Sequence, residues 1–153
     1  MSASSRPPSL DELRGALREA GLRATPARMA VLARLRGDEW GAGRAAAPIS
    51  HPELADALAS HGWDRVTIYR NLVDLTQAGL ARRTDIGDHV WRFEATRPSH
   101  GSVEAHPHFV CNECGTVQCV PESAVNVAET GVPGAAFGRA IEIQLKGVCV
   151  RCQ

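Results

Sequence analysis

The residues of this 153-residue chain best suited to chemistry are its five cysteines, all in the last third of the sequence. Four of them form two C-x-x-C pairs, Cys111 with Cys114 and Cys149 with Cys152. A tight turn within such a pair brings two sulfurs onto one tetrahedral ion, so two pairs complete the ligand set of a zinc site. Redox-active cysteines are the alternative, although a redox pair more typically opens a helix after a strand. We predict that these four cysteines bind structural Zn²⁺.

A second group of possible ligands begins just before the first pair. His106 and His108 are two positions apart, so in a strand both imidazoles face the same way, about 6 to 7 Å apart, which suits one shared ion. Cys111 has the opposite parity, which indicates a second metal site rather than extra ligands for the first. If the chain turns back antiparallel at the first pair, Cys119 falls opposite these histidines and becomes a third ligand. The alternatives are a pair of surface histidines and a small buried cysteine.

The elements that position these ligands form a small C-terminal domain, predicted over residues 106–153. Its sequence contains the strand-like stretches PHFVC, TVQCVP and AIEIQLKGVCV around a weakly helical segment. A piece this short rarely folds on apolar burial alone, so we expect it to need both the metal and a partner subunit. Residues 95–105 lack periodicity and contain Pro, Gly and small polar residues, so they are predicted to be a hinge or linker.

Residues 1–94 are predicted to form an N-terminal domain of four helices and a hairpin. Ser9, Thr25 and Ser50 have the character of N-caps and mark the starts of the first three helices. The segment LARRTDIGDHVWRFE alternates around a Gly-Asp turn, as a two-stranded hairpin does. Helices followed by a hairpin are typical of a winged helix that binds DNA. A generic small helical domain with a hairpin is the alternative.

The fourth predicted helix, within DRVTIYRNLVDLTQAGL, carries the most information about function. Its spacing places Ile68, Leu72 and Leu75 on a buried stripe and leaves polar side chains, with Asn71 among them, on the free face. Donors on such a face can contact a DNA groove, and arginines of the following hairpin can contact phosphates. The predicted DNA contacts are Arg65, Thr67, Tyr69, Arg70, Arg82 and Arg83.

Composition limits the class of protein. Lys and Arg number 17 and Asp and Glu number 17, so net charge does not indicate nucleic acid and the prediction depends on local pattern. No apolar run approaches the roughly 18 residues that cross a bilayer, and the N-terminus lacks a secretion signal, so we expect a cytoplasmic protein with reduced thiols and no membrane contact. We find no nucleophile–base motif, phosphate loop or paired catalytic carboxylates, so we do not expect an enzyme.

Taken together, these motifs resemble the ferric-uptake-regulator (Fur) family of dimeric, metal-responsive transcriptional repressors. The resemblance runs from GLRATPARMAVL through VTIYRNLVDLTQAGL and WRFE to HPHFVCNECGTV and the last CVRC. It implies an α+β fold, with an N-terminal winged helix-turn-helix domain and a small C-terminal α/β dimerisation domain that carries the structural zinc. It also implies that Tyr69 and Arg70 lie on the recognition helix at positions that touch DNA.

The resemblance further implies a regulatory metal that bridges the two domains, with matching positions at Glu94, His106, His108 and Cys119. Iron and manganese sensors of the family usually carry a carboxylate in place of Cys119, and a thiolate favours a softer ion such as Zn²⁺. A further ligand expected ahead of the third helix falls near Pro48, which cannot bind, and His51 lies nearby as a substitute. The family's other optional site is lost, because ligand positions are occupied by Ala105 and Pro107.

We therefore expect a homodimer that binds a palindromic operator in double-stranded DNA and represses metal-homeostasis genes. Its cofactors would be structural Zn²⁺ and a second divalent ion, with Zn²⁺ favoured over Fe²⁺ and Mn²⁺. The alternatives are an iron-responsive, manganese-responsive or peroxide-sensing regulator of the same family and, in a different class, a zinc-ribbon interaction module without DNA binding.

Overall fold

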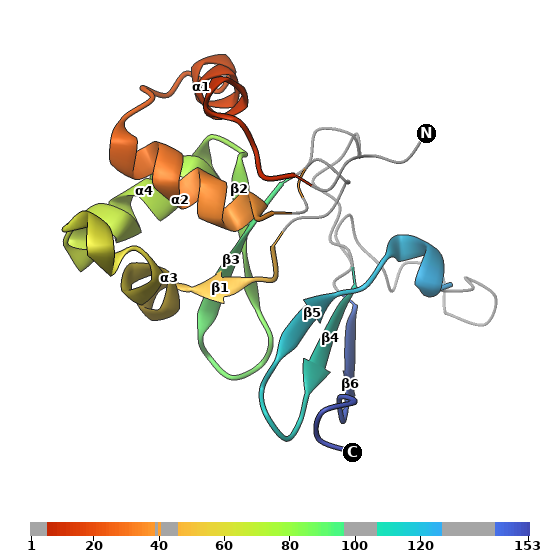
Figure 1. Ribbon diagram of the computed structural model, residues 1–153. Coiled ribbons are helices and arrows are strands. Elements are labelled where there is room, and N and C mark those ends of the chain that lie inside the picture. Colours follow the sequence, from red (N-terminus) through yellow and green to blue (C-terminus); the bar gives the residue numbers. More distant parts are fainter. Residues whose placement is uncertain (1–5, 39, 41–45, 97–106, 127–142) are drawn as a thin grey trace. The chain divides into compact units, whose positions relative to one another are not determined.

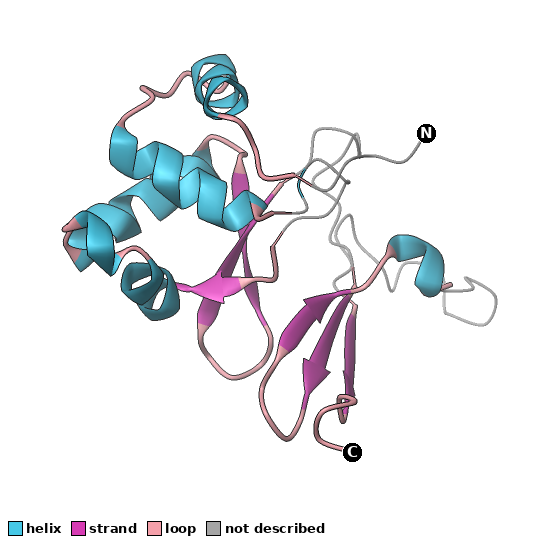
Figure 2. Ribbon diagram, in the orientation of Figure 1, coloured by secondary structure: helices cyan, strands magenta, loops and turns pink. Residues whose placement is uncertain are grey.

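The computed structural model describes residues 6–38, 40, 46–96, 107–126 and 143–153. The chain divides into two compact units, residues 1–97 and 98–153, and each is described by itself. Helices predominate among the described residues of the first unit, and the described part of the second contains a small sheet (Figure 1 and Figure 2), so the fold is α+β, as predicted. None of the helices found in the described residues combines the length and the apolar character that a membrane span requires.

The described part of the first unit contains four α-helices: α1 (Leu10–Glu19), α2 (Pro26–Arg36), α3 (His51–Ala57) and α4 (Arg65–Gln77). Each begins where a side-chain oxygen accepts a hydrogen bond from a backbone N–H of the first turn, which satisfies a donor that the helix itself leaves unpaired. The capping residues are the predicted Ser9, Thr25 and Ser50, and Asp64 for α4. A short 3-10 helix, η2 (Ala59–His61), follows α3.

A three-stranded antiparallel sheet completes the first unit. Its strands lie in the order β1-β3-β2, with β1 (Ile49–Ser50), β2 (Ala81–Asp85) and β3 (Trp91–Ala95). β2 and β3 form the predicted hairpin, with Arg83 opposite Phe93. The connecting turn contains two residues with positive φ, Gly87 at 91° and His89 at 60°, so it is wider than a two-residue turn. In Figure 1 the hairpin loop extends beyond β1 and α3.

The helices and the sheet of the first unit share one apolar core. The predicted stripe of α4, formed by Ile68, Leu72 and Leu75, is fully buried and packs with apolar side chains of the other helices and of the sheet. Asn71 is a correction: it was predicted on the free face but is 7% exposed, and its Nδ2 donates to the carbonyl oxygen of Thr67. Asn71 lies three positions after Ile68 and four before Leu75, which is the spacing of the stripe itself.

The described part of the second unit is a three-stranded sheet in the order β5-β4-β6. Its strands are β4 (His108–Cys111), β5 (Val117–Cys119) and β6 (Gln144–Gly147), and a short 3-10 helix, η3 (Glu122–Ala124), follows β5. β5 pairs antiparallel with β4 and places Cys119 directly opposite His108, as the predicted turn-back at the first cysteine pair requires. β6 pairs parallel with β4, and Gly147 lies opposite Cys111.

Some predicted features lie outside the described residues. They include His106, most of the predicted hinge at residues 95–105 and residues 127–130 of the weakly helical segment at 122–130, whose first residues form η3. Strand β3 runs to Ala95, so the sheet of the first unit includes the first residue of that hinge. The predicted domain boundaries at residues 94 and 106 remain predictions.

Candidate metal centre and nucleic-acid interface

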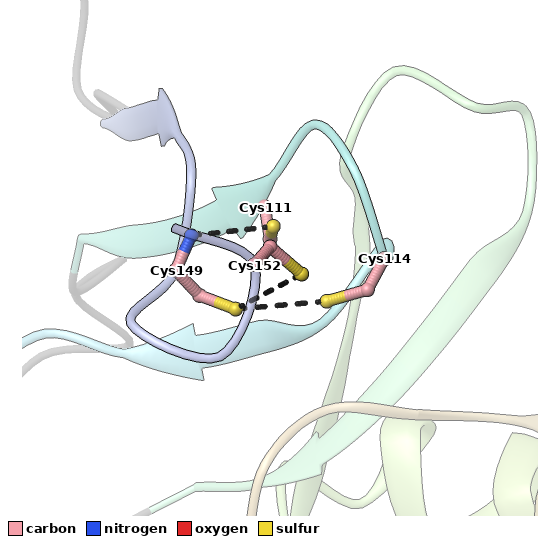
Figure 3. A group of neighbouring side chains, drawn as sticks. All are labelled: Cys111, Cys114, Cys149 and Cys152. Carbon is pink, nitrogen blue, oxygen red and sulfur yellow. Dashed lines mark hydrogen bonds between the residues drawn. The ribbon is translucent and has the colours of Figure 1, made fainter.

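The two C-x-x-C pairs meet at one end of the sheet of the second unit. Cys111 is the last residue of β4 and Cys114 lies in the turn to β5, while Cys149 and Cys152 follow β6. Because β4 and β6 run parallel and side by side, their carboxyl ends lie together and bring the two pairs into contact. Figure 3 shows the four side chains converging, with their sulfur atoms toward one another.

Backbone hydrogen bonds within each pair set the direction of the sulfur atoms. The N–H of Gly115 donates to the carbonyl oxygen of Cys111 at 3.0 Å, and the N–H of Cys152 donates to that of Cys149 at 2.9 Å. Gly115 has a φ of 68°, a left-handed conformation that costs glycine least. The N–H of Cys149 also donates to the sulfur of Cys111 at 3.4 Å (Figure 3) and joins the two pairs.

The distances between the sulfur atoms fit a tetrahedral ion. The Sγ of Cys149 lies 3.7 Å from that of Cys114 and 3.6 Å from that of Cys152. All four sulfurs lie within 4.8 Å of one another. A tetrahedron with metal–sulfur bonds of about 2.3 Å has sulfur–sulfur edges of about 3.8 Å. Four sulfur donors at this spacing make a site of zinc type.

The acidities of these thiols are shifted in opposite directions. Hydrogen bonds from the hydroxyl and the backbone N–H of Thr116 lower the pKa of Cys114 to about 6. The backbone N–H groups of Cys114 and Cys149 also lower the pKa of Cys111. The sulfurs of Cys149 and Cys114 instead raise the pKa of Cys152 to about 12. Some thiols thus ionise readily while another retains its proton, and a metal ion removes this conflict because it deprotonates each thiol that it binds.

Two neighbours of this group were not identified from the sequence. The Oγ1 of Thr116 lies 3.1 Å from the Sγ of Cys114 and accepts a hydrogen bond from the Nη2 of Arg151 at 3.0 Å. Arg151 lies within the second pair, so this contact connects the two pairs through Cys114. Thr116 could have been found from the sequence as a hydroxyl residue two positions after Cys114. The partner of Arg151 depends on the parallel arrangement of β4 and β6, which the sequence did not indicate.

Two of the predicted regulatory ligands lie together in the second unit. His108 is 1% exposed and faces Cys119 across the β4–β5 pair. Residues directly opposite in an antiparallel pair have Cβ atoms about 4.5 to 5.5 Å apart, so an imidazole and a thiol there can share one ion. Glu94 belongs to the first unit, where it is buried in β3 and its Oε1 accepts a hydrogen bond from the Nε of Arg82 at 2.5 Å.

The candidate substitute ligand His51 has a different partner. Its Nε2 lies 2.8 Å from the carbonyl oxygen of Arg65, the first residue of α4. Its ring meets the ring of Tyr69 edge-on, with the centroids 5.3 Å apart. His51 therefore links the start of α3 to the first turns of α4, and its role as a substitute metal ligand stays a prediction.

The free face of α4 carries the polar side chains expected there. Tyr69 is 48% exposed, Arg65 and Arg70 are exposed, and Thr67 is half-buried. One turn after Arg70, Asp74 forms an ion pair with Arg28 that fixes α4 to α2. Hydroxyl and guanidinium donors thus project from a helix whose buried face is held in place by the core.

The two arginines predicted as phosphate contacts on the hairpin have different environments. Arg82 is 16% exposed and is ion-paired with Glu94 directly opposite on β3. Its role as a phosphate contact stays a prediction, and the ion pair places a carboxylate beside its charge. Arg83 points to the other face of the hairpin, where its guanidinium lies 4.3 Å from the ring centroid of the exposed Trp91.

Comparison with known proteins places these sites in context. The model of the Ferric uptake regulator family matches residues 19–136. The Ferric uptake regulation protein of Bacillus subtilis is 30% identical over 88 residues, which are 56% of this chain and 58% of that protein. The Peroxide-responsive repressor PerR of Staphylococcus aureus is 26% identical over 151 residues, 94% of this chain and 91% of that protein. The Ferric uptake regulator of Pseudomonas aeruginosa, solved with manganese, matches with a TM-score of 0.59 at 26% identity, over 90% of this chain and 97% of that chain.

Proposed function

The chain belongs to the ferric uptake regulator family, and we propose that it is a homodimeric transcriptional repressor that binds DNA when a divalent metal ion is bound. One combination of features supports this function. The first unit presents the exposed polar face of α4, and the second contains a cross-strand imidazole–thiol pair beside a four-cysteine group. The first feature suits a DNA groove and the second suits metal ions.

The four cysteines of the two pairs are assigned to Zn²⁺ that serves as a fold element. When bound, the ion supplies positive charge among four thiolates and cross-links the ends of β4 and β6. The backbone of the chain itself shapes this site, because hydrogen bonds donated by the N–H groups of Gly115, Cys149 and Cys152 hold the sulfurs at their mutual distances.

The sensed ion is assigned to Glu94, His106, His108 and Cys119, a grouping that follows the family resemblance. The cross-strand pairing of His108 with Cys119 supports it. Zn²⁺ is favoured over Fe²⁺ and Mn²⁺ because Cys119 offers a sulfur ligand. The regulated genes would then include those of zinc homeostasis.

We assign the dependence of DNA binding on metal binding to a shift in the population of dimer conformations. Residues 1–94 and 106–153 are the proposed domains and residues 95–105 the proposed hinge. Ligands drawn from both sides of the hinge onto one ion would favour one spacing of the two recognition helices in the dimer. Two-fold symmetry then requires a palindromic operator. We assign the DNA contacts to Arg65, Thr67, Tyr69 and Arg70 on α4 and to Arg82 and Arg83 on the hairpin.

Metal-dependent binding of the full chain to duplex DNA, selected from a random-sequence library, tests the function. Protein that retains zinc on the four cysteines is freed of weakly bound metal and titrated with Zn²⁺, Mn²⁺ or Fe²⁺. We expect palindromic selected sites, affinity that rises with added ion, and reversal by a mild chelator. If no sequence is selected with any ion, DNA binding is contradicted and a zinc-ribbon interaction module remains.

Peroxide sensing is a second candidate, favoured by the similarity to the peroxide-responsive repressor of Staphylococcus aureus. The same assay separates the two functions. Loss of DNA binding after peroxide treatment, with metal present throughout, supports a peroxide sensor. Binding that survives peroxide and follows the concentration of one ion supports a metal sensor.

The variant Cys119→Ser tests the assignment of the sensed ion. It should keep its structural zinc and its dimer, and either lose one metal equivalent per chain or shift its preference toward harder ions. Gln118→Ala is the matched control, because Gln118 is the neighbouring exposed residue of β5 on the opposite face of the strand. If His108→Ala abolishes the second metal while Cys119→Ser leaves affinity and preference unchanged, Cys119 is a structural residue and the preference for zinc loses its support.

The variant Arg70→Ala tests the recognition helix. Loss of a bidentate base contact should weaken operator binding by about 1 to 3 kcal/mol, and loss of a phosphate contact by less. Arg18→Ala removes the same charge from an exposed position on α1 and is the control. Equal affinities of the two variants at matched salt would contradict the assignment of α4.

A further inference from the structure

We propose that Cys149 is a modification site. In the zinc-loaded chain its thiolate is the first of the four to react with small, uncharged α,β-unsaturated carbonyl compounds, while Thr116, held by Arg151, shields Cys114 from the same reaction. The inference rests on the assignment of Zn²⁺ to the two C-x-x-C pairs and does not require that the chain binds DNA. It gives a chemical reactivity to cysteines that are otherwise assigned to the fold.

A directed chain of hydrogen bonds ends on the sulfur of Cys114. The Nη2 of Arg151 donates to the Oγ1 of Thr116 at 3.0 Å, and that Oγ1 lies 3.1 Å from the Sγ of Cys114. A zinc-bound thiolate has no proton to give, so the hydroxyl of Thr116 is the donor to the sulfur. A sulfur lone pair that accepts a hydrogen bond is less available to form a bond to carbon. Thr116 therefore protects Cys114, and Arg151 fixes the direction of its hydroxyl.

The other cysteine of the first pair is protected in a different way. Cys111 is 1% exposed, and its sulfur accepts a hydrogen bond from the N–H of Cys149 at 3.4 Å (Figure 3). An electrophile can therefore reach Cys111 only after the fold around it has opened. Both sulfurs of the first pair thus have a hydrogen-bond donor of the chain directed at them.

The sulfur of Cys149 has different neighbours. Its hydrogen-bonding contacts found among the described residues are two other sulfurs, that of Cys114 at 3.7 Å and that of Cys152 at 3.6 Å (Figure 3). Thiols that bind one cation lose their protons, so in the zinc-loaded chain these contacts no longer donate a hydrogen bond. Cys149 is also half-buried, whereas Cys111 is buried. Its thiolate is therefore the less protected nucleophile.

A pocket of about 290 Å³ adjoins Cys149 within the second unit. Among the described residues its lining includes Cys149 and none of the other three cysteines of the pairs. The rest of the lining combines apolar side chains with hydrogen-bond donors: Phe109, Val148, Val150, Thr116, Gln118 and Arg151. Its volume is just below the roughly 300 Å³ at which ligand pockets begin, so it suits a small molecule. An uncharged compound with an apolar body and one carbonyl oxygen matches this lining.

Addition to such a compound balances without an oxidant or a reductant. The thiolate of Cys149 forms a bond from its sulfur to the β-carbon, and the π electrons of the carbon–carbon double bond shift toward the carbonyl oxygen. The guanidinium of Arg151 and the amide of Gln118 are the donors of the pocket that suit this oxygen, and water then supplies a proton to the α-carbon. The product is a neutral thioether, which binds zinc far more weakly than a thiolate does. Modification of Cys149 therefore releases the end of β6 from the ion.

The test maps the order of modification in the full zinc-loaded chain. Cys119→Ser serves as the background, because it leaves the cysteines of the two pairs as the only thiols. The chain is treated with cyclohexenone, adducts are located by peptide mass spectrometry, and zinc release is followed with a coloured chelator. We expect the first adduct on Cys149, with zinc released at the same rate. A first adduct on any other cysteine would overturn the proposal.

A second electrophile tests the pocket itself. Acrylamide is also an unsaturated carbonyl compound, but it lacks the apolar ring of cyclohexenone. The rate of each compound at Cys149 is divided by its rate with glutathione, which has no pocket. The ratio should be larger for cyclohexenone than for acrylamide. Equal ratios would show that the apolar lining selects nothing and would overturn the assigned class of electrophile.

The variant Thr116→Val tests the shield at Cys114, because it removes the hydroxyl and keeps the size of the side chain. Modification of Cys114 should become roughly 3- to 10-fold faster, which is the range expected for the loss of one hydrogen bond. The rate at Cys149 should not change. Thr116→Ser keeps the hydroxyl and is the matched control. Equal rates at Cys114 in Thr116→Val and Thr116→Ser would remove the shield from the proposal.

The outcomes separate this inference from the proposed function. The same mapping on the wild-type chain, with Cys119 scored apart, needs no substitution and keeps the test valid if a variant fails to fold. If the purified chain holds no zinc on the two pairs, the zinc assignment and this inference are both overturned. If zinc is bound and the first adduct forms elsewhere in the pairs, this inference alone is overturned, and metal-dependent DNA binding is unaffected.

Discussion

The two units of this chain reach stability by different routes. In the first, apolar side chains from all four helices and the sheet share one buried core. In the described part of the second, three short strands bury Val110, Cys111 and Val117 beside His108. Apolar burial contributes about 25 cal/mol per Å², so such a small core offsets little of the entropy of the ordered chain. Among the described residues, the first unit therefore shares its stability among many side chains, and we expect the second to depend on its four thiols and their ion.

Loss of a zinc ligand should produce the largest difference in stability between the two units. Cys114→Ser is expected to unfold the second unit, because the free energy of metal binding at such a site is folding free energy. The helical signal of the first unit should persist with its own melting transition. Circular dichroism and zinc analysis of the full chain measure both effects, and Gln118→Ala, at an exposed position of β5 outside both proposed metal sites, serves as the control. If Cys114→Ser kept the zinc content and the melting behaviour of the wild type, the second unit would not depend on its zinc ligands and the contrast between the units would be refuted.

A core truncation should damage the first unit alone. Leu72 is fully buried on α4, so Leu72→Ala should lower the free energy of unfolding of that unit by about 2 to 5 kcal/mol. The zinc content of the second unit should not change. Urea unfolding followed by helical signal, with zinc release recorded in parallel, measures this. If zinc is released in step with the loss of helix, the units fold as one and the comparison fails.

The ion pair between Arg82 and Glu94 offers a sharper test, because it connects the stability of the first unit to metal. Arg82→Met removes the positive charge beside a buried carboxylate and should cost about 1 to 3 kcal/mol. Arg82→Lys keeps the charge and is the control. If Glu94 is a metal ligand, added Zn²⁺ should restore part of the loss in urea unfolding. No restoration at saturating ion would remove Glu94 from the proposed ligand set.

The smallest effect is expected at a helix cap. Hydrogen bonds from the hydroxyl and the backbone N–H of Ser50 hold the pKa of Glu53 below its ordinary value of 4.5. A carboxyl whose pKa falls on folding stabilises the protein above its unfolded pKa and loses that effect as the pH drops through the folded value. Glu53→Gln should therefore lower stability by a few tenths of a kcal/mol at pH 7, and the difference from wild type should vanish in acid.

Thermal melts of Glu53→Gln and wild type, at pH 7 and at a pH below the folded pKa of Glu53, measure the contribution of this cap to stability. A loss of several kcal/mol would mean that the first unit, too, depends on single residues. A difference that persists below the folded pKa of Glu53 would show that its charge is not the cause.

What the sequence predicted well was local in origin. The caps at Ser9, Thr25 and Ser50 depend on residues within one turn, and the four-cysteine group depends on spacing. Even the pairing of His108 with Cys119 followed from one local reversal of the chain and strand parity.

What the sequence missed depends on partners that lie far along the chain. The two-residue strand β1 exists because β3 pairs with it, and the parallel placement of β6 beside β4 has no local signal. The same holds for the carboxylate partner of Arg82 and for the contact of His51 with α4. In each case the residue type allowed several roles, and the tertiary neighbour selected one.

The parallel pairing of β4 with β6 has a consequence for how this chain tolerates change in length. Cys114 and Cys149 are 35 positions apart in sequence, yet their sulfurs are 3.7 Å apart. The entropy of closing a loop grows only logarithmically, by about 0.6 kcal/mol for each doubling of its length. Insertions between β5 and β6 should thus change the free energy with which the ion links the two strands only slightly. A protease cut there would leave two fragments still held at one point by sulfur–metal bonds, so that the nick shows on a denaturing gel and not in the native mass.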